Sequence, residues 1–362
     1  MIKFIPFIFA AFVLFISSCN QNVNRAENSR EIVDMLGRHV YIPENVERVV
    51  GVSAGALRLL TYMGEANRVV GIEEHEFRTP KPYTIANPEL LLLPVIGPMM
   101  GGDSELILQA KPDVIFITYT TVANANALQK RTGIPVIAID CTELYTHRHI
   151  LYDSFKLISK VFHKPTRADS LIAYIENTIL AMDSLTSTIS VQKKPKVYIG
   201  GISYRGSHGI ASTHPFYPPF EFANANNVAR QINEEKFSHV KGTFIDIEQL
   251  LVWNPDILFV DSGGIDLVLK SINQNKILER NISAIKNRNM YVLYAYNNYA
   301  THYEMVLANS WYVAKKMYPE KFAHIDIKEK VNEITNMFLG KPIYDELIAE
   351  SGAYTEFKIR QY

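Results

Sequence analysis

One stretch of sequence that occurs twice indicates the fold of this chain. Residues 103–117 read DSELILQAKPDVIFI, and residues 246–260 read DIEQLLVWNPDILFV. Both copies have a polar head, an apolar helical face, a Pro-Asp turn and a continuous apolar run, in the same order and spacing. We therefore predict a short helix, a turn and a buried strand in each half of the chain, and two lobes of similar design.

The sequence on either side of these segments alternates short apolar runs with helical patterns. The predicted strands are residues 49–52, 69–72, 114–117 and 136–139 in the first half and 196–200, 257–260 and 290–293 in the second. The predicted helices include 56–63, 123–132 and 303–317. Strands that alternate with helices form parallel sheets covered on both faces. The predicted fold class is α/β, with two Rossmann-like lobes whose sheets are mainly parallel.

A helical segment separates the two halves. From Pro165 onward, Ile172, Ile175, Ile179 and Met182 fall three and four residues apart, which predicts an apolar stripe on a helix of about 24 residues, ~36 Å long. We predict that residues 149–190 form a linker with this one long helix, between an N-terminal lobe at 31–148 and a C-terminal lobe at 191–362. A core helix that belongs to one lobe is the alternative.

Composition narrows the class of protein. The chain has 362 residues, 48% of them apolar, which is enough to bury the cores of two domains. Lys and Arg number 37 and Asp and Glu number 37, so no overall positive field favours nucleic acid as a partner. Two cysteines, Cys19 and Cys141, exclude a disulfide framework and a Cys-rich zinc site. We expect Cys141 to be a small core residue.

The N-terminus has the pattern of a secretory signal. Lys3 is followed by an apolar stretch of about thirteen residues, shorter than the ~20 that a membrane-spanning helix needs. Ser17-Ser18-Cys19 resembles the end of a bacterial lipoprotein signal, in which the cysteine receives lipid before cleavage. We predict a signal peptide at 1–18, lipid on Cys19 and a flexible tether at 19–30. An ordinary signal peptide, with Cys19 present by chance, is the alternative.

Aromatic and cationic side chains are concentrated in the segments that follow predicted strands. The carboxyl ends of strands face the ligand crevice in open α/β sheets. Aromatic rings offer flat contact area, and arginine pairs with carboxylate, catecholate or hydroxamate oxygens. We predict that a bulky, partly anionic metal chelate binds there, and that some of these residues are ordinary packing. The candidate ligand-binding residues are Arg78, Tyr83, Tyr119, Tyr204, Arg205, His208, Tyr217, Tyr296, Tyr299 and His302.

Two other patterns suggest different chemistry. Residues 51–55 read GVSAG, which fits the nucleophile elbow of a serine hydrolase with Ser53 as nucleophile. A strand-to-helix turn capped by Ser53 is the preferred interpretation, because no acid and histidine follow persuasively. His147 and His149 form a pair that we expect on the surface. A receptor for bare zinc or manganese, using His208 or His302, is a secondary hypothesis.

Several motifs together resemble one family. They are Asp34-Met35-Leu36-Gly37-Arg38 near the start, Lys111-Pro112-Asp113 in the first repeat copy, and Tyr318-Pro319-Glu320-Lys321-Phe322 near the end. The chain resembles the solute-binding proteins of ABC importers for iron-siderophore, haem and cobalamin, the class whose lobes are joined by a single helix. The resemblance implies a lipid-anchored, extracytoplasmic, monomeric receptor without enzymatic activity, resident metal or cofactor. The implied ligand is a ferric siderophore or related metal chelate, with cobalamin or haem as alternatives.

The resemblance also implies a partner. In that family each lobe presents a surface glutamate that docks onto arginines of the membrane permease, a dimer that works with an ATPase. The matching positions are Glu105 and Glu248, each seven residues before the proline of its Pro-Asp turn. Acidic residues placed at helix N-termini, where the helix dipole favours them, are the alternative interpretation.

Overall fold

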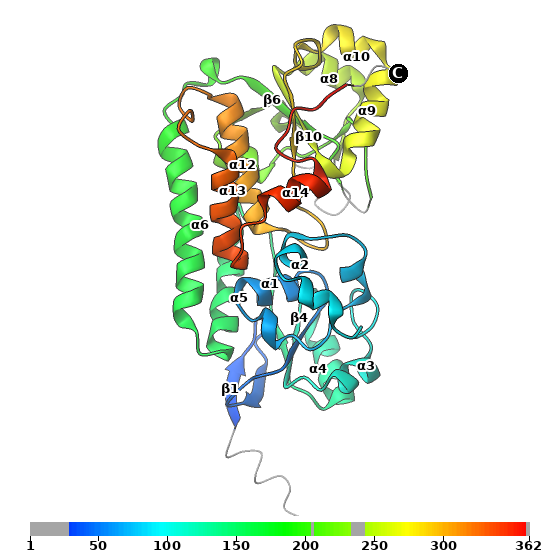
Figure 1. Ribbon diagram of the computed structural model, residues 1–362, viewed down its shortest axis with the longest axis vertical. Coiled ribbons are helices and arrows are strands. Elements are labelled where there is room, and N and C mark those ends of the chain that lie inside the picture. Colours follow the sequence, from blue (N-terminus) through cyan, green and yellow to red (C-terminus); the bar gives the residue numbers. More distant parts are fainter. Residues whose placement is uncertain (1–28, 204–205, 233–242, 360–362) are drawn as a thin grey trace, which may run out of the picture.

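The computed structural model describes residues 29–203, 206–232 and 243–359. The predictions for the signal peptide at 1–18, for Cys19 and for Tyr204 and Arg205 lie outside these residues, as does most of the tether. Figure 1 shows two lobes arranged along the long axis, with a layer of long helices beside them. Across the described ranges no helix combines the length and the apolar character needed to cross a membrane.

The N-terminal lobe is built on a small parallel sheet. Strands β3 (Val49–Val52), β4 (Val114–Ile117) and β5 (Val136–Ala138) pair in the order β3-β4-β5. An antiparallel hairpin, β1 (Ser29–Val33) and β2 (His39–Pro43), precedes the sheet. The helices are α1 (Ala56–Tyr62), α2 (Pro82–Ala86), α3 (Ser104–Ala110) and α4 (Val122–Thr132).

One predicted strand of this lobe is wrong. Residues 69–72 do not form a strand and make only isolated bridges, from Val69 to Val49 and from Ile72 to Val95. The segment pairs with β3 for one residue and then leaves the sheet to meet the chain around Val95, so no continuous ladder forms.

The C-terminal lobe has the second parallel sheet. Its order is β11-β10-β6-β8, with β6 (Lys196–Gly200), β8 (Asn226–Asn227), β10 (Ile257–Asp261) and β11 (Met290–Leu293). Strands β7 (Ser212–Thr213) and β9 (Thr243–Phe244) form an antiparallel pair. The helices are α7 (Pro218–Phe222), α8 (Ile247–Trp253), α9 (Ile265–Gln274), α10 (Lys276–Asn281) and α11 (Ser283–Lys286).

The repeated sequence forms the same unit in both lobes, as α3-turn-β4 and α8-turn-β10. In the first copy the Asp113 N–H donates to the Arg48 carbonyl over 2.8 Å, and the Asp113 carboxylate accepts from the Arg48 N–H over 2.9 Å. In the second copy Asp256 makes both bonds with Lys196, each 2.8 Å long. The Pro-Asp turn therefore ties each new strand to the beginning of its neighbour, and the two-lobe prediction is confirmed.

The predicted long helix is α6 (Pro165–Thr186), which has 22 residues and begins at a proline in its first turn. It runs alongside α5 (Arg148–Val161) and also packs on α12 (Tyr303–Met317). Helix α13 (Ile327–Leu339) packs on α1 and α2 of the N-terminal lobe, with Phe338 5.1 Å from the Tyr62 ring. The last helices of the chain, which end with α14 (Tyr344–Ser351), thus do not belong to the C-terminal lobe alone.

Helix α12 is the central helix of the molecule. Its residues from Tyr303 to Ala314 are all buried, because the helix is apolar on nearly every side and is enclosed by other elements. One continuous apolar cluster includes side chains of α12, of β3 and of β6. The two lobes are therefore joined through a shared core as well as through α6.

Candidate functional site

The carboxyl ends of the two sheets face each other across the interface between the lobes. Helix α6 carries the chain from the N-terminal lobe to the far end of the molecule, so β6 runs back toward the N-terminal lobe (Figure 1). Several hydrogen bonds cross this interface, and two of them come from Tyr303 and Asn298. The Tyr303 hydroxyl donates to the Thr142 carbonyl over 2.8 Å, and the Asn298 amide donates to the Thr79 hydroxyl over 3.2 Å.

Arg58 on α1 holds a loop of the other lobe. Its side chain is buried, and its guanidinium donates to the carbonyls of Asn298, Tyr299 and Thr301 over 2.8, 2.9 and 2.8 Å. Tyr299 and Ala300 have positive φ angles of 53° and 71°, a conformation that costs about 1–3 kcal/mol per non-glycine residue. Charge-assisted hydrogen bonds from Arg58 offset this cost. Arg58 therefore determines the shape of the loop after β11.

Glu73 joins the same loop to the N-terminal lobe. Its carboxylate accepts hydrogen bonds from the Tyr299 hydroxyl over 2.5 Å, from the Ser53 N–H over 3.1 Å and from the Gly101 N–H over 3.2 Å. Burial raises the pKa of Glu73, and these three donors oppose that increase. Tyr299 thus lies where the prediction placed it, at the interface, but its hydroxyl is engaged by the protein.

A buried polar cluster lies beside Arg58. The Tyr83 hydroxyl donates to Glu76 over 2.5 Å, and the wholly buried Lys81 ammonium lies 3.4 Å from the same carboxylate. The His302 ring stacks on the Tyr83 ring at 5.8 Å. Burial, together with the charge of Arg58, lowers the pKa of His302 to about 4, so the ring is neutral at physiological pH. Tyr83 and His302 are both wholly buried and support the loops from inside, and their assignment as ligand contacts stays a prediction.

Asp261 lies at the carboxyl end of β10 and is 4% exposed. One carboxylate oxygen, Oδ1, accepts from the Gly263 N–H over 3.0 Å and from the Ser203 hydroxyl over 3.2 Å. Burial raises the pKa of Asp261 to about 7. Tyr217 and Tyr296 pack nearby with ring centroids 5.5 Å apart. Tyr296 is largely buried and Tyr217 is wholly buried, so both pack in the core here, and their ligand contacts stay predictions.

Tyr119 is one of the predicted ligand residues that are exposed. It follows β4, has a positive φ angle of 48° and is 57% exposed. Beneath it, Cys141 is buried as predicted, with Sγ 3.4 Å from the Ala54 carbonyl, and burial raises the pKa of the thiol to about 11. Arg78 is exposed, and His208 is half-buried with its ring edge-on to Phe244 at 5.0 Å.

The structure brings some predicted residues together and reveals others that were missed. It pairs Tyr83 with His302 and Tyr217 with Tyr296. The missed residues are Arg58, Glu73 and Asp261. Asp261 directly follows an apolar strand, so the rule that selected the loop residues would have found it. Arg58 is the single charge in an otherwise apolar helix, which is a signal for a buried, partnered cation.

The residues of the alternative predictions are also placed. Ser53 has a positive φ angle of 70° and is buried, and its N–H is bonded to Glu73. The His147 side chain is exposed and lies 2.9 Å from the Glu143 carboxylate, and the His147 and His149 rings are 6.4 Å apart. Within the described parts of the chain, no group of three or more His, Cys, Asp or Glu side chains is placed to hold a metal ion.

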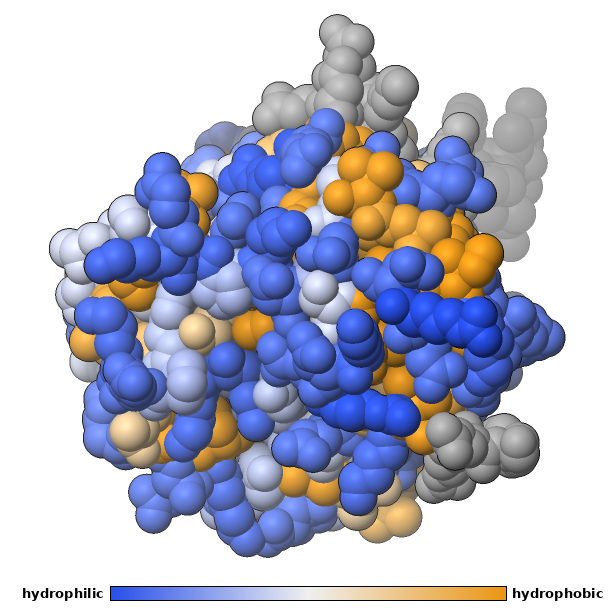
Figure 2. Space-filling view, turned by 90° about the horizontal axis from the view of Figure 1, so that it is seen from above, coloured by the Kyte–Doolittle hydropathy of each residue, from blue (hydrophilic) through white to orange (hydrophobic). Residues whose placement is uncertain are grey.

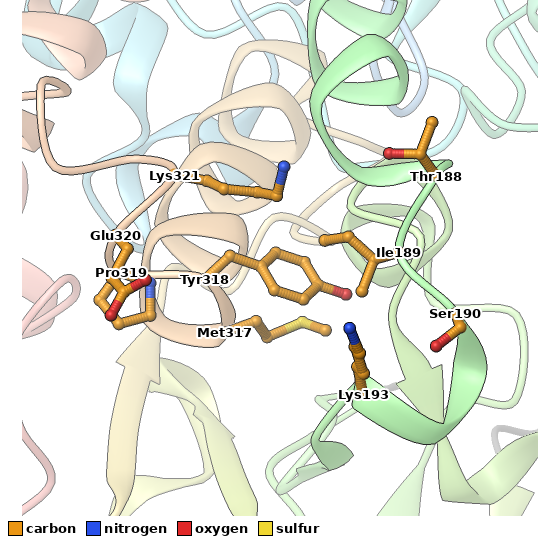
Figure 3. A pocket seen from close by; sticks show the side chains of 9 residues that line it. All are labelled: Thr188, Ile189, Ser190, Lys193, Met317, Tyr318, Pro319, Glu320 and Lys321. Atoms are coloured by element: carbon orange, nitrogen blue, oxygen red, sulfur yellow. The ribbon is translucent and has the colours of Figure 1, made fainter.

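Two surface cavities lie away from the interface. One of about 630 Å³ lies where α6 and α12 end (Figure 3), and its lining includes Lys193, Tyr318 and Lys321. The other, of about 810 Å³, lies beside β2 and α4 and is lined in part by Tyr41 and Gln129. Neither is lined by a predicted ligand residue.

Comparison with known proteins identifies the family. The model of a family described as periplasmic binding protein matches residues 49–296. The chain belongs to the periplasmic binding protein family. Among its relatives, this periplasmic binding protein is 26% identical over 331 residues to the molybdate-binding protein MolA of Haemophilus influenzae, which covers 85% of this chain and 90% of MolA.

Solved structures show the same fold. Molybdate-bound MolA superposes with a TM-score of 0.65 at 23% identity, covering 86% of this chain and 98% of MolA. A periplasmic solute-binding protein of Veillonella parvula gives 0.70 at 20% identity, covering 90% and 97%. The haem-binding protein HutB of Vibrio cholerae gives 0.55 at 17% identity, covering 75% and 99%. The predicted family resemblance is confirmed: the chain is a periplasmic binding protein, and its solved neighbours share its fold.

Proposed function

We propose that this periplasmic binding protein captures a compact anionic metal species, a molybdate-type oxyanion, between the carboxyl ends of β4 and β10. The observation that carries the proposal is the direct contact between the lobes at the loop after β11. There Tyr299 bonds Glu73 and Arg58 bonds the loop carbonyls. A Cβ added to Gly55 would lie 3.1 Å from the Ala300 Cβ. These contacts occupy one side of the interface and favour a small ligand over a macrocycle.

Polar hydrogen-bonding groups suit such a ligand at the remaining side. Tyr119 is exposed at the end of β4, while Ser203 and Asp261 lie together at the ends of β6 and β10. Hydroxyl groups are donors for oxyanion oxygens. The description of the relative MolA as molybdate-binding supports the same class of ligand.

A ferric siderophore is the second candidate. The exposed Tyr119 and Arg78, together with Phe77, which is 44% exposed, give aromatic and cationic surface at the edge of the interface. Such surface favours a flat chelate with anionic oxygens. Haem and cobalamin are larger than molybdate, and the contacts between the lobes disfavour ligands of that size.

Calorimetric titration with a panel of solutes tests the proposal. The panel is molybdate, tungstate, ferric catecholate and hydroxamate siderophores, haem, cobalamin, zinc and manganese. We expect 1:1 binding of molybdate at micromolar or lower Kd. Binding of a ferric siderophore in place of molybdate would select the second candidate. Failure of every solute to bind at micromolar concentration would refute the proposed ligand class.

We further propose that lipid on Cys19 anchors the protein and that Glu105 and Glu248 dock it onto the permease. Both glutamates are exposed and hold equivalent places in α3 and α8, on opposite lobes. Figure 2, which views the end with the C-terminal lobe, shows a mainly hydrophilic surface with apolar patches. Val252 on α8 is 78% exposed. Replacement of Cys19 by serine should release the protein from membranes, and retention there would contradict the anchor.

A further inference from the structure

Asp261 is a buried carboxylate at the proposed ligand interface, and it has no cationic partner among the described residues. Its Oδ1 atom accepts both of its hydrogen bonds, from the Gly263 N–H and the Ser203 hydroxyl. A buried carboxylate is normally paired with a cation or strongly hydrogen-bonded, because losing hydration disfavours its charged form. The second oxygen, Oδ2, is therefore the atom on which a proton would reside.

The polar groups around Asp261 come from several neighbouring segments. Ser203 follows β6, Tyr217 directly precedes α7, and Tyr294 and Tyr296 follow β11. The segment with His208 packs its backbone against Gly264. In the described ranges, none of these neighbours is a lysine or arginine. Among the described residues, no positive charge would thus lie between an ionised Asp261 and an incoming anion.

We propose that Asp261 is the residue that recognises the charge of the ligand: with an anion bound, its Oδ2 carries a proton and donates a hydrogen bond to a ligand oxygen. The proton comes from solvent, so capture of the anion takes up one proton at pH values where the free protein has lost it. This inference rests on the function proposed above. It makes Asp261 a determinant of specificity that favours anions with acceptor oxygens.

The pH dependence of affinity follows from this linkage. Burial sets the pKa of Asp261 in the free protein at about 7. Below that pH the side chain is already protonated and affinity is constant. Above it, each bound anion requires one proton, so affinity falls about tenfold per pH unit. Molybdate itself keeps one charge state in this range, and the slope therefore reports on the protein.

Calorimetric titration of the full-length protein with sodium molybdate between pH 6 and pH 9 tests the inference. At pH 8.5, two buffers with different ionisation enthalpies give the number of protons taken up, which we expect to approach one. In Asp261→Asn the amide accepts the same bonds at Oδ1 and donates permanently from its nitrogen. This variant should take up no proton, show less than a threefold change in affinity across the range and bind at least tenfold more tightly than wild type at pH 8.5.

Asp266→Asn is the matched control, because Asp266 is exposed on α9 of the same lobe. It should keep the wild-type proton uptake and slope. Molybdate binding without proton uptake in wild type, or an unchanged slope in Asp261→Asn, would overturn the inference and leave the proposed function intact. If neither molybdate nor a ferric tris-catecholate binds to wild type, the proposed function fails and the inference fails with it.

Discussion

The Tyr299 hydroxyl donates a 2.5 Å hydrogen bond to the Glu73 carboxylate, across the interface between the two lobes. Glu73 also accepts the N–H groups of Ser53 and Gly101, which follow β3 and precede α3. One carboxylate thereby connects three segments of the N-terminal lobe and the loop of the C-terminal lobe. The relationship makes the loop after β11 part of the wall of the proposed site.

Tyr299→Phe removes this bond and leaves a buried carboxylate with one donor fewer. We expect the free energy of unfolding to fall by about 1–3 kcal/mol, measured by urea denaturation. Tyr119→Phe is the control, because Tyr119 is 57% exposed and its change should leave stability nearly unaltered while weakening ligand binding. Equal stability of wild type and Tyr299→Phe would show that the bond does not join the lobes.

Arg58→Met leaves three carbonyls of the loop after β11 without their donor and removes the charge beside Glu304 and Glu76. We expect a loss of about 3–5 kcal/mol in the free energy of unfolding, because buried charges lose their partner. Arg58→Lys keeps the charge but lacks the planar guanidinium that reaches three carbonyls. The free energy of unfolding of this variant should lie between those of Arg58→Met and wild type. An Arg58→Met protein as stable as wild type would contradict the role of Arg58 in holding the loop.

The raised pKa of Asp261 predicts how stability depends on pH. In the unfolded chain an aspartate has its ordinary pKa of 3.8, whereas burial in the folded protein raises the pKa of Asp261 to about 7. The folded state therefore retains the proton at higher pH, and the associated stability is complete below about pH 4 and is lost as pH rises to about 7. An asparagine at position 261 does not titrate, so Asp261→Asn does not lose this stability as pH rises. Relative to wild type, the variant should gain nothing at pH 4 and up to about 4 kcal/mol at pH 8.

Thermal denaturation of both proteins from pH 4 to pH 8 measures this difference. The gap between their melting temperatures should open between pH 4 and pH 7 and then stay constant. If the melting temperatures of the two proteins changed in parallel with pH, Asp261 would titrate like an exposed carboxylate, and its raised pKa would be contradicted.

Charge reversal at the proposed docking residues should separate transport from binding. Glu105→Arg combined with Glu248→Arg should abolish uptake in cells while affinity in solution stays within twofold of wild type, because both side chains are exposed in the first turns of α3 and α8. Surface ion pairs contribute only about 0–1 kcal/mol each, so the pair acts mainly by orienting the complex. Glu89→Arg with Glu346→Arg is a control of equal charge. A parallel loss of ligand affinity, or unimpaired uptake, would refute the docking role.

Most of the helices and strands could be predicted from the sequence, because the patterns that indicate them are local. Predicted strands 49–52, 196–200 and 290–293 coincide with β3, β6 and β11, and the helix at 303–317 coincides with α12. Each depends on a run of apolar residues and on turn chemistry within a few positions. The strand at 69–72 failed because its pairing depends on where the chain around Val95 lies.

The residues of the candidate site could be predicted only in part. A position after a strand shows which edge of the sheet a residue belongs to, but not whether its side chain points into the interface or into the core. Tyr217 and His302 lie at that edge and are nevertheless wholly buried, because α12 and the loop after β11 enclose them. The hydrogen bond from Arg58 to the Tyr299 carbonyl joins residues 241 positions apart, so no local sequence pattern could predict it.

The central claim is that the ligand binds between the carboxyl ends of β4 and β10, and anomalous diffraction from crystals grown with molybdate tests it most directly. We predict one molybdenum peak at the molybdenum absorption edge, within hydrogen-bonding reach of the Tyr119 hydroxyl and of Asp261. A peak in either surface cavity, or no ordered molybdenum in crystals soaked well above the Kd measured in solution, would contradict it.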